Sequence, residues 1–317
     1  MPASDPVISV VVPLYQEEQR VDLLLASVQE TLDGIGDAWE LVLVDDGSTD
    51  GTWPRIRDAA QSRPNLAAIR LSRNFGKEAA LCAGLEAATG EIAIVMDGDL
   101  QHPPDLIPAM VARWRETDCD VVEAVKTGHR RDAAAGRFFG RFFYWSMRKF
   151  SGFDLRGASD FKLITRRVLD AWLRLGERNL FFRGMIAWLG FRHEQLPFEV
   201  PRQPKRQSRW STRRLVDLGT TGITAFSSVP LRAASLLGVI FFVFALGLGI
   251  QSLWMKFSGN AVEGFTTVII LQLLIGSLLM MLLGIIGEYI ARIYEEVKGR
   301  PRYLVADEIR RDGDAAP

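Results

Sequence analysis

Apolar and polar residues alternate in blocks along the first part of the chain, and the blocks predict strands and helices in turn. Short β-branched and apolar runs predict strands at 7–13, 39–46, 66–72, 91–99 and 120–125. Apolar residues at helical spacing predict helices between them, at 17–32, 76–90 and 103–114. Continuous apolar strands separated by helices favour an α/β fold with a doubly wound, mostly parallel sheet.

Two later segments, 233–255 and 264–287, contain no charged residue, and each is long enough to cross a bilayer. A pair of buried core helices would seldom be this long without a charge. The short connection 256–263 makes the pair a helical hairpin. Arginine and lysine flank its outer ends, within 202–232 and 292–302. The positive-inside rule then predicts a multi-pass protein of the inner (plasma) membrane, with both termini and the N-terminal domain in the cytoplasm.

These patterns divide the chain into four predicted parts. They are a cytoplasmic α/β domain at 1–210, interfacial helices at 211–232, a transmembrane hairpin at 233–290 and a cytoplasmic tail at 291–317. The aromatic and basic stretch 136–150 suits either a helix at the membrane surface or an ordinary helix packed on the sheet.

Composition narrows the class of protein. The chain has 38 basic and 38 acidic residues, and this balance gives no sign of nucleic-acid binding. The two cysteines, Cys82 and Cys119, stand far apart and form neither a metal knuckle nor a disulfide framework, which fits a reducing compartment. The N-terminus lacks the basic region and cleavage site of a signal peptide.

Acidic residues follow three of the predicted strands, in "PLYQEE", "DDGSTD" and "DGD". In doubly wound sheets, ligands bind beyond the carboxyl ends of the strands, so these residues together indicate a site. Asp97 and Asp99 are only one residue apart, and two carboxylates so close repel each other unless a cation lies between them. Mg²⁺ commonly binds one or two carboxylates and completes its shell with phosphates and water.

Five stretches together resemble the GT-A-fold family 2 glycosyltransferases. They are "VVPLYQEE", "LVLVDDGSTDGT", "SRNFGKEAAL", "MDGDLQHPP" and "GEYIARIYEEVKGRPRYLV". More narrowly, they are similar to bacterial polyprenyl-phosphate glycosyltransferases with two C-terminal spans, relatives of dolichyl-phosphate mannose synthase. The resemblance covers roughly 7–305. It implies that a UDP- or GDP-sugar gives its sugar, with inversion, to a polyprenyl phosphate at the bilayer, with Mg²⁺ or Mn²⁺ as cofactor. Small residues in the spans fit a homo-oligomer.

The resemblance also implies roles for individual residues. Donor-binding positions are Pro13, Tyr15, Glu17, Val44, Asp45, Asp46, Asp97, Gly98 and Lys126. Metal-side positions are Asp97, Asp99 and Gln101, and the catalytic candidates are Asp99 and Asp160. The acceptor phosphate would meet basic residues whose side chains match phosphate oxygens: Arg202, Lys205, Arg206 and Arg209.

Several alternatives stay open. Asp160 would act as a base or as an orienting group. An orienting role is open because a phosphate acceptor is already largely ionised and needs little proton removal. Lys77 would contact a diphosphate or lie in solvent. His102 could ligate a metal, but a position on the surface is the simpler expectation. One alternative function is a family 2 transferase that acts on a sugar hydroxyl of a lipid-linked or growing glycan. Another is a membrane-anchored protein that binds nucleotide sugars without catalysis.

Overall fold

The computed structural model describes residues 6–100, 102–126, 159–177, 181–198, 229–258 and 264–310. The described chain forms two compact units. One is an α/β domain that includes the residues after 300, and the other contains two long helices. The helix expected at 136–150 and residues 211–228 of the interfacial helices expected at 211–232 lie outside the described residues. Residues 229–232 instead begin the first of the two long helices.

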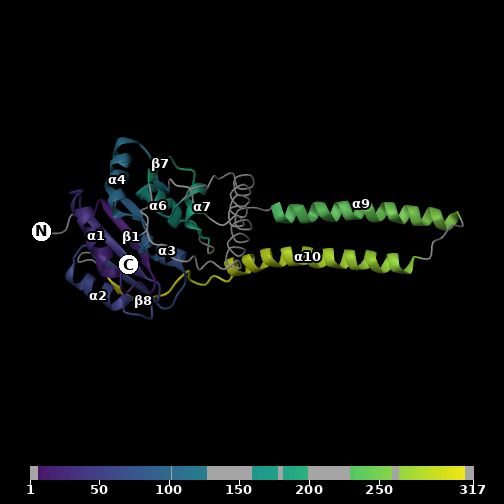
Figure 1. Ribbon diagram of the computed structural model, residues 1–317, viewed down its shortest axis with the longest axis horizontal. Coiled ribbons are helices and arrows are strands. Elements are labelled where there is room, and N and C mark those ends of the chain that lie inside the picture. The colour runs from purple at the N-terminus through teal and green to yellow at the C-terminus, as the bar shows by residue number, and fades with distance from the viewer. Residues whose placement is uncertain are drawn as a thin grey trace. The chain divides into compact units, whose positions relative to one another are not determined.

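The α/β domain is built on one eight-stranded sheet with the order β7-β5-β6-β4-β1-β2-β3-β8 (Figure 1). The predicted strands form β1 (Ile8–Leu14), β2 (Trp39–Asp45), β3 (Leu66–Leu71), β4 (Ile92–Val95) and β5 (Val121–Lys126). The structure adds three strands that the apolar pattern does not predict: β6 (Lys162–Thr165), β7 (His193–Phe198) and β8 (Val305–Ile309). Strands β6 and β8 run against their neighbours, and the other pairs are parallel. The α/β class is therefore confirmed, with a mixed sheet.

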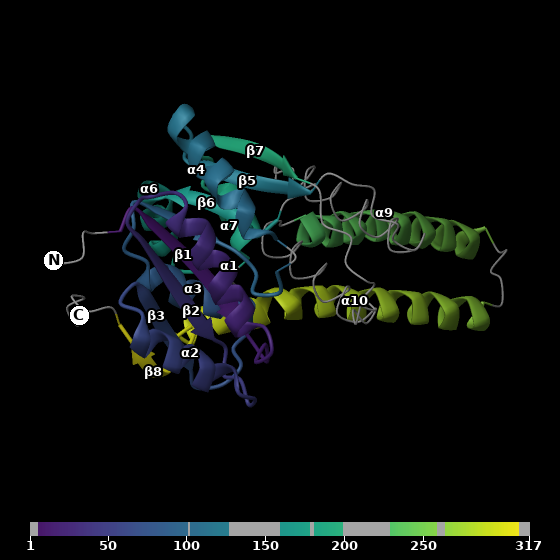
Figure 2. The ribbon, with the colours of Figure 1, turned by 60° about the vertical axis from the view of Figure 1, so that its left-hand side comes forward.

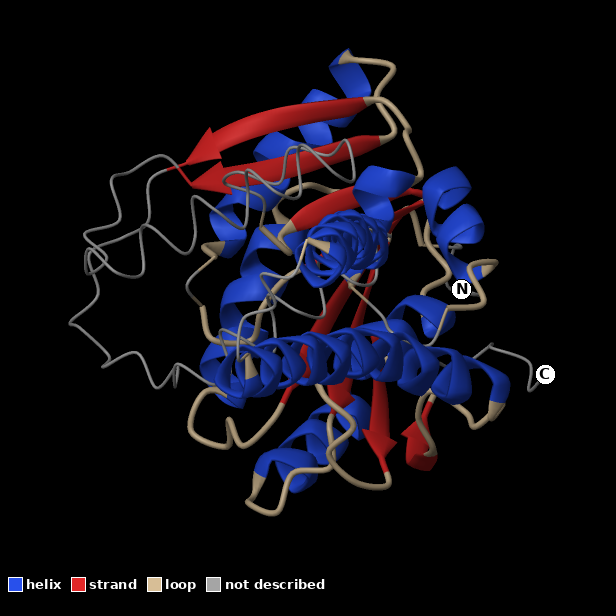
Figure 3. Cartoon of the chain, turned by 90° about the vertical axis from the view of Figure 1, so that its right-hand side faces the viewer, coloured by secondary structure: helices blue, strands red, loops and turns tan. Residues whose placement is uncertain are grey.

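Helices cover both faces of this sheet (Figures 2 and 3). The main apolar core joins the sheet to α1 (Val21–Asp33), α2 (Thr52–Ser62) and α4 (Ile107–Glu116), which follows the short turn η1 (Pro104–Leu106). The opposite face carries α3 (Lys77–Ala87), and α6 (Arg166–Leu173) packs on β4 and β6 beside α7 (Phe182–Trp188). Strand side chains alternate between the faces, so each strand contributes to both layers.

Helix α3 lies unusually close to the sheet. Its residues 79–85 are all buried. A Cβ on Gly84 would overlap Val11 and Val44 of the strands beneath. The helix begins after Gly76, whose φ of +100° suits only glycine. This close packing fixes the first turn of α3, which carries Lys77, at the carboxyl edge of the sheet.

The residues after the long helices return to the α/β domain. Strand β8 pairs with β3, and Ser72 N–H donates to Leu304 O at 2.8 Å. Arg302 donates to Leu175 O, and Tyr303 O–H donates to Glu86 on α3. The predicted tail at 291–317 thus contains a strand of the sheet, which its sequence did not indicate.

The second unit contains α9 (Val229–Phe257) and α10 (Phe265–Val297). Among the described residues, one segment, Leu274–Val297, is long and apolar enough to cross a membrane, and α9 contributes the shorter apolar stretch Leu236–Gln251. Large apolar side chains on both helices are exposed, such as Phe242 at 68% and Leu283 at 58%. Apolar surface of this extent needs an apolar partner or solvent.

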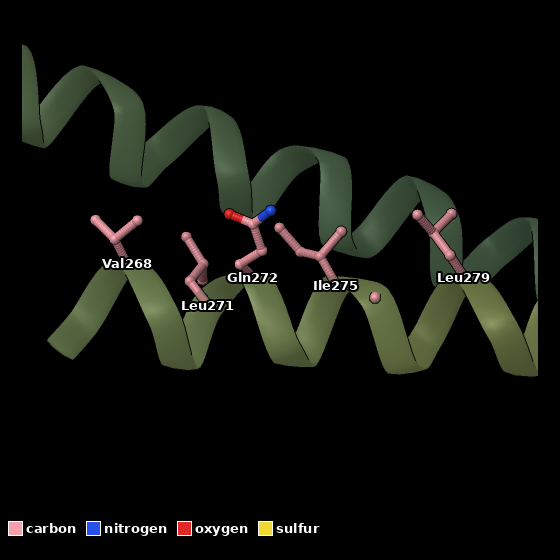
Figure 4. Close-up of a pocket in the computed structure, with 6 residues that line it drawn as sticks. Val268, Leu271, Gln272, Ile275 and Leu279 are labelled. Atoms are coloured by element: carbon pink, nitrogen blue, oxygen red, sulfur yellow. The ribbon is translucent and has the colours of Figure 1, made fainter. Parts of the chain in front are cut away.

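A shallow groove of about 320 Å³ runs along α10 where it faces α9 (Figure 4). Its lining is apolar apart from one amide, and consists of Val268, Leu271, Gln272, Ile275, Gly276 and Leu279.

Candidate active site

The carboxyl ends of β1, β2 and β4 meet at one edge of the sheet, because these strands are parallel neighbours. The loop after β1 is fastened to the turn after β2: Gln16 N–H donates to Ser48 Oγ at 2.9 Å, and Glu17 N–H donates to Thr52 Oγ1 at 3.0 Å. Tyr15 on this loop is 43% exposed. The loop therefore presents its side chains at the edge where the acidic residues gather.

The two aspartates that end β2 have different partners. Asp46 accepts hydrogen bonds from Phe75 N–H at 2.7 Å and from Gly76 N–H at 2.9 Å, so it orders the loop that leads into α3. Asp45 Oδ1 accepts from Ser48 N–H at 3.2 Å. Asp45 Oδ2 is buried, lies 3.5 Å from Arg70 Nε, and receives no hydrogen bond from the described residues. Burial raises the pKa of both carboxyls.

The other predicted donor-binding residues of β1 and β2 lie inside the sheet. Pro13 and Val44 are neighbours across the two strands. Val44 is fully buried, and its side chain packs beneath Gly84 of α3. Whether either residue contacts a nucleotide stays a prediction.

Lys77 supplies a cation beside the first of the two close carboxylates. Its Nζ forms ion pairs with Asp97, after β4, and with Asp160, before β6, the second at 2.5 Å. Arg183 on α7 donates two hydrogen bonds to the same Asp160, from Nε to Oδ1 at 2.5 Å and from Nη2 to Oδ2 at 2.8 Å. We call Asp160, Lys77, Asp97 and Arg183 the Asp160 cluster.

Charge in this cluster is strongly stabilised. Burial alone would raise the pKa of Asp160, but the Arg183 hydrogen bonds and the charges of Lys77 and Arg183 hold it well below its usual range. Burial would likewise lower the pKa of Lys77, but Asp97 and Asp160 outweigh it and raise that pKa. Asp160 and Lys77 are therefore both charged at neutral pH.

The turn after β4 is shaped by Gly98. A Cβ at this position would overlap Leu14 Cδ2 at the end of β1, so a larger residue would require the buried Leu14 side chain to shift. His102, expected on the surface, is instead buried between the rings of Phe161 and Phe198, with centroids at 5.4 and 5.9 Å. Its Nδ1 lies 3.8 Å from Asp97 Oδ2. The surface prediction is wrong because two aromatic side chains distant in the sequence, Phe161 just before β6 and Phe198 at the end of β7, enclose the ring.

Comparison with known proteins identifies the family. The family model described as Glycosyl transferase family 2 matches residues 9–165. An uncharacterized glycosyltransferase of Synechocystis is 35% identical over 302 residues, which cover 95% of each chain. The bactoprenol glucosyl transferase of Shigella phage SfX is 34% identical, covering 94% of this chain and 98% of its own. The chain belongs to glycosyl transferase family 2.

Two solved structures align more loosely with this glycosyltransferase. Glucosyl-3-phosphoglycerate synthase of Mycobacterium tuberculosis, in complex with UDP, is 22% identical at a TM-score of 0.48, covering 68% of this chain and 79% of its own. A mannosyltransferase of Pyrobaculum calidifontis, in complex with GDP-Man and Mn²⁺, is 19% identical at 0.45, covering 89% and 88%. At these scores the two structures say nothing further about the ligands of this chain.

The residues after β4 fit a divalent cation by their chemistry. Asp97 and Asp99 offer carboxylate oxygens, the ligands that Mg²⁺ and Mn²⁺ prefer. Within the described residues there is no group of three or more His, Cys, Asp or Glu side chains that could hold a metal alone. A cation here would therefore take the rest of its shell from Gln101, which lies outside the described residues, or from water and substrate phosphates.

Some of the predicted site residues lie outside the described part of the chain. Among them are all four basic residues proposed for the acceptor phosphate, between 202 and 209. Lys126 ends β5, where its main chain pairs with Phe198, and its side chain is not described.

Sequence reasoning missed two residues that the structure brings to Asp160. Arg183 is the one charge inside the apolar stretch "LFFRGMIAW", and that isolation was the only available signal. Glu78, the neighbour of Lys77, accepts a hydrogen bond from Phe182 N–H at 2.9 Å. Both belong to elements far from Asp160 in the sequence.

The titration of Glu78 gives a prediction for stability. Burial raises its pKa from 4.5 to about 7, so the folded state binds this proton more tightly than the unfolded chain does. The contribution of Glu78 to stability is complete below about pH 4.5 and declines as the pH rises towards about 7. Glu78→Gln does not titrate, so its melting temperature relative to wild type should rise from pH 5 to pH 8. Parallel melting curves for the two proteins across this range would contradict the assignment.

Proposed function

We propose that this enzyme transfers a sugar, with inversion, from a UDP- or GDP-sugar to a polyprenyl phosphate at the cytoplasmic face of the plasma membrane. Relatives described as bactoprenol glucosyl transferases support this proposal, because they match nearly the whole chain at 33–34% identity. The observation that carries it is the Asp160 cluster, which places an ionised carboxylate and two cations beside the Asp97–Asp99 turn.

The nucleotide would bind at the carboxyl ends of β1 and β2. Asp45 Oδ2 is a buried acceptor without a hydrogen-bond donor among the described residues, and a base N–H or ribose hydroxyl would satisfy it. Tyr15 is exposed nearby and offers a ring for stacking. Leaving such an acceptor unmatched costs about 1–3 kcal/mol, which a bound nucleotide would recover.

The donor diphosphate would lie near the Asp97–Asp99 turn and the start of α3. Asp97, Asp99 and Gln101 would hold Mg²⁺ or Mn²⁺, and such a cation stabilises charge on a leaving diphosphate when bound. Lys77 and the main-chain N–H groups at the start of α3 are placed to bind anionic groups.

Asp160 acts in this proposal as an orienting group rather than as a base. A general base works best when its pKa lies near the working pH, and the pKa of Asp160 is held far below it. The phosphate acceptor is itself largely ionised at neutral pH and needs little proton removal. Asp160 would therefore hold the reacting sugar or the acceptor in place.

The two long helices form a membrane hairpin in this proposal. Helix α10 has 33 residues and is about 50 Å long, more than the hydrocarbon core needs. The chain leaves the α/β domain before α9 and returns to the same sheet as β8 after α10. This return supports an even number of crossings, and therefore the proposal of two spans rather than one. The groove along α10, with Gly276 in its lining, lies where α10 faces α9, and its small residue would let the two helices of the hairpin pack closely.

The acceptor phosphate would meet the basic run that precedes the hairpin. Changing Arg202, Lys205, Arg206 and Arg209 to glutamine should raise the KM for undecaprenyl phosphate at least about tenfold, because each charge-assisted contact contributes about 1.5–3 kcal/mol. The KM for the nucleotide sugar should change less than about threefold. Steady-state kinetics in detergent measure both values, and equal increases would show that the run serves membrane topology alone.

A transferase that acts on a sugar hydroxyl is the second candidate function, favoured only by the breadth of the family match. The two candidates differ in product: the first forms a sugar phosphodiester with the lipid, and the second leaves lipid phosphate unconsumed.

A further inference from the structure

We propose that Glu78 is a positioning residue that fixes the start of α7, so that Arg183 reaches Asp160 in the geometry that transfer requires. This inference rests on the proposed function, because it takes Asp160 to act at the reacting sugar. Glu78 does not itself touch Asp160 through a hydrogen bond. It acts through the main chain of the residue that precedes Arg183.

The contacts close a ring between two helices. Adjacent residues of α3 reach across: Lys77 to Asp160 and Glu78 to Phe182 N–H. Adjacent residues of α7 supply the other ends: Phe182 N–H donates to Glu78, and Arg183 donates to Asp160, which lies before β6. Because Phe182 and Arg183 are neighbours, a shift of α7 along α3 would break the Arg183 contact together with the Glu78 contact.

Phe182 is suited to serve as the fixed point. Its side chain is completely buried and packs edge-on against Trp172, with ring centroids 6.0 Å apart. Packing holds the ring, and Glu78 holds the main-chain N–H. Helix α7 has only seven residues, so it has little rigidity of its own, and its orientation depends on such contacts.

A carboxylate is a costly choice at this position unless it performs a task. The charges of Lys77 and Arg183 favour the ionisation of Glu78, but burial and the nearby charge of Asp160 outweigh them and raise its pKa. The residues that follow on α3, 79–85, are buried, and an apolar side chain at position 78 would avoid the desolvation cost. What Glu78 adds beyond packing is a hydrogen-bond acceptor aimed at α7.

The test uses four variants of the full-length protein in detergent. Glu78→Ala removes the acceptor, Glu78→Asp keeps a carboxyl group but shortens its reach, and Glu78→Gln keeps an acceptor oxygen at the same reach. Glu86→Ala is the matched control. It removes a carboxylate from the same helix, but this carboxylate accepts a hydrogen bond from Tyr303 on the tail rather than from α7.

The first readout is hydrogen–deuterium exchange of the peptide spanning 181–188, without substrate. Glu78→Ala and Glu78→Asp should exchange faster there, whereas Glu78→Gln and Glu86→Ala should match wild type. The second readout is sugar transfer to undecaprenyl phosphate from the donor that wild type uses. Glu78→Ala and Glu78→Asp should lower kcat about 10- to 100-fold, as a misplacement of about 1 Å does, and leave the donor KM within about twofold.

Three results would overturn the inference. They are a Glu78→Gln variant as impaired as Glu78→Asp, a Glu86→Ala variant as impaired as Glu78→Ala, or unchanged exchange in every Glu78 variant. If Glu78→Ala fails to fold, the comparison of Glu78→Asp with Glu78→Gln decides. Exchange needs no substrate, so a wild-type protein without transfer activity would refute the proposed function and leave the exchange result to decide whether Glu78 holds α7.

Discussion

Replacing Asp99 with alanine should reduce metal-dependent sugar transfer by at least about 10³-fold, because the cation that neutralises the diphosphate contributes several kcal/mol to the transition state. Asp99 is partly exposed in the turn after β4, so its loss should leave the fold intact. Transfer from nucleotide sugar and the affinity for Mn²⁺ in the presence of the nucleotide measure the two effects together.

A matched control for this variant is Asp105→Ala, which removes an exposed carboxylate a few residues further along the chain. It should keep both Mn²⁺ affinity and transfer near wild type. If Asp99→Ala turned over at a normal rate, the Asp97–Asp99 turn would have no part in catalysis.

Replacing Asp160 with asparagine is the second change with a large expected effect. The side chain keeps its shape but loses the charge that Lys77 and Arg183 share. We expect kcat to fall about 10²- to 10³-fold, as it does when a preorganised electrostatic group is lost. The free energy of unfolding should also fall, by about 1–2 kcal/mol, since the two cations lose their partner but are partly exposed to water.

The control for this second variant is Asp170→Asn on α6. Asp170 is 51% exposed and 3.8 Å from Arg166, so its loss should change stability by less than about 0.5 kcal/mol and leave kcat unchanged. Thermal unfolding and transfer assays on both variants separate the two contributions. An Asp160→Asn enzyme with normal kcat would show that the cluster only stabilises the fold.

The sequence was informative where the signal is local. Apolar runs in the sequence predict β1 to β5, and the helices between these runs predict that the strands are mostly parallel. Strand β8 could not be found in this way, because "VADEI" becomes a strand only by pairing with β3, more than two hundred residues earlier. Strand β7 alternates too weakly to stand out and is formed by pairing with β5.

In the candidate site, too, residues with a local signal were predicted, and contacts between distant segments were not. Acidic strand ends indicated Asp45, Asp97 and Asp99 directly, and the family resemblance added Asp160. The partners of Asp160 come from helices 83 and 23 residues away, and no local pattern reveals which cation faces it. The burial of His102 likewise depends on two aromatic side chains that are distant in the sequence, Phe161 and Phe198.

The measurement that tests the account most directly is a transfer assay with the purified full-length enzyme. The protein receives undecaprenyl phosphate, Mg²⁺ or Mn²⁺, and a panel of UDP- and GDP-sugars, and mass spectrometry detects the lipid product and the free nucleotide. The account predicts a metal-dependent lipid-phosphate sugar from one donor, absent with Asp99→Ala. Release of nucleotide without a lipid product, or transfer to a sugar hydroxyl with lipid phosphate unconsumed, would contradict it.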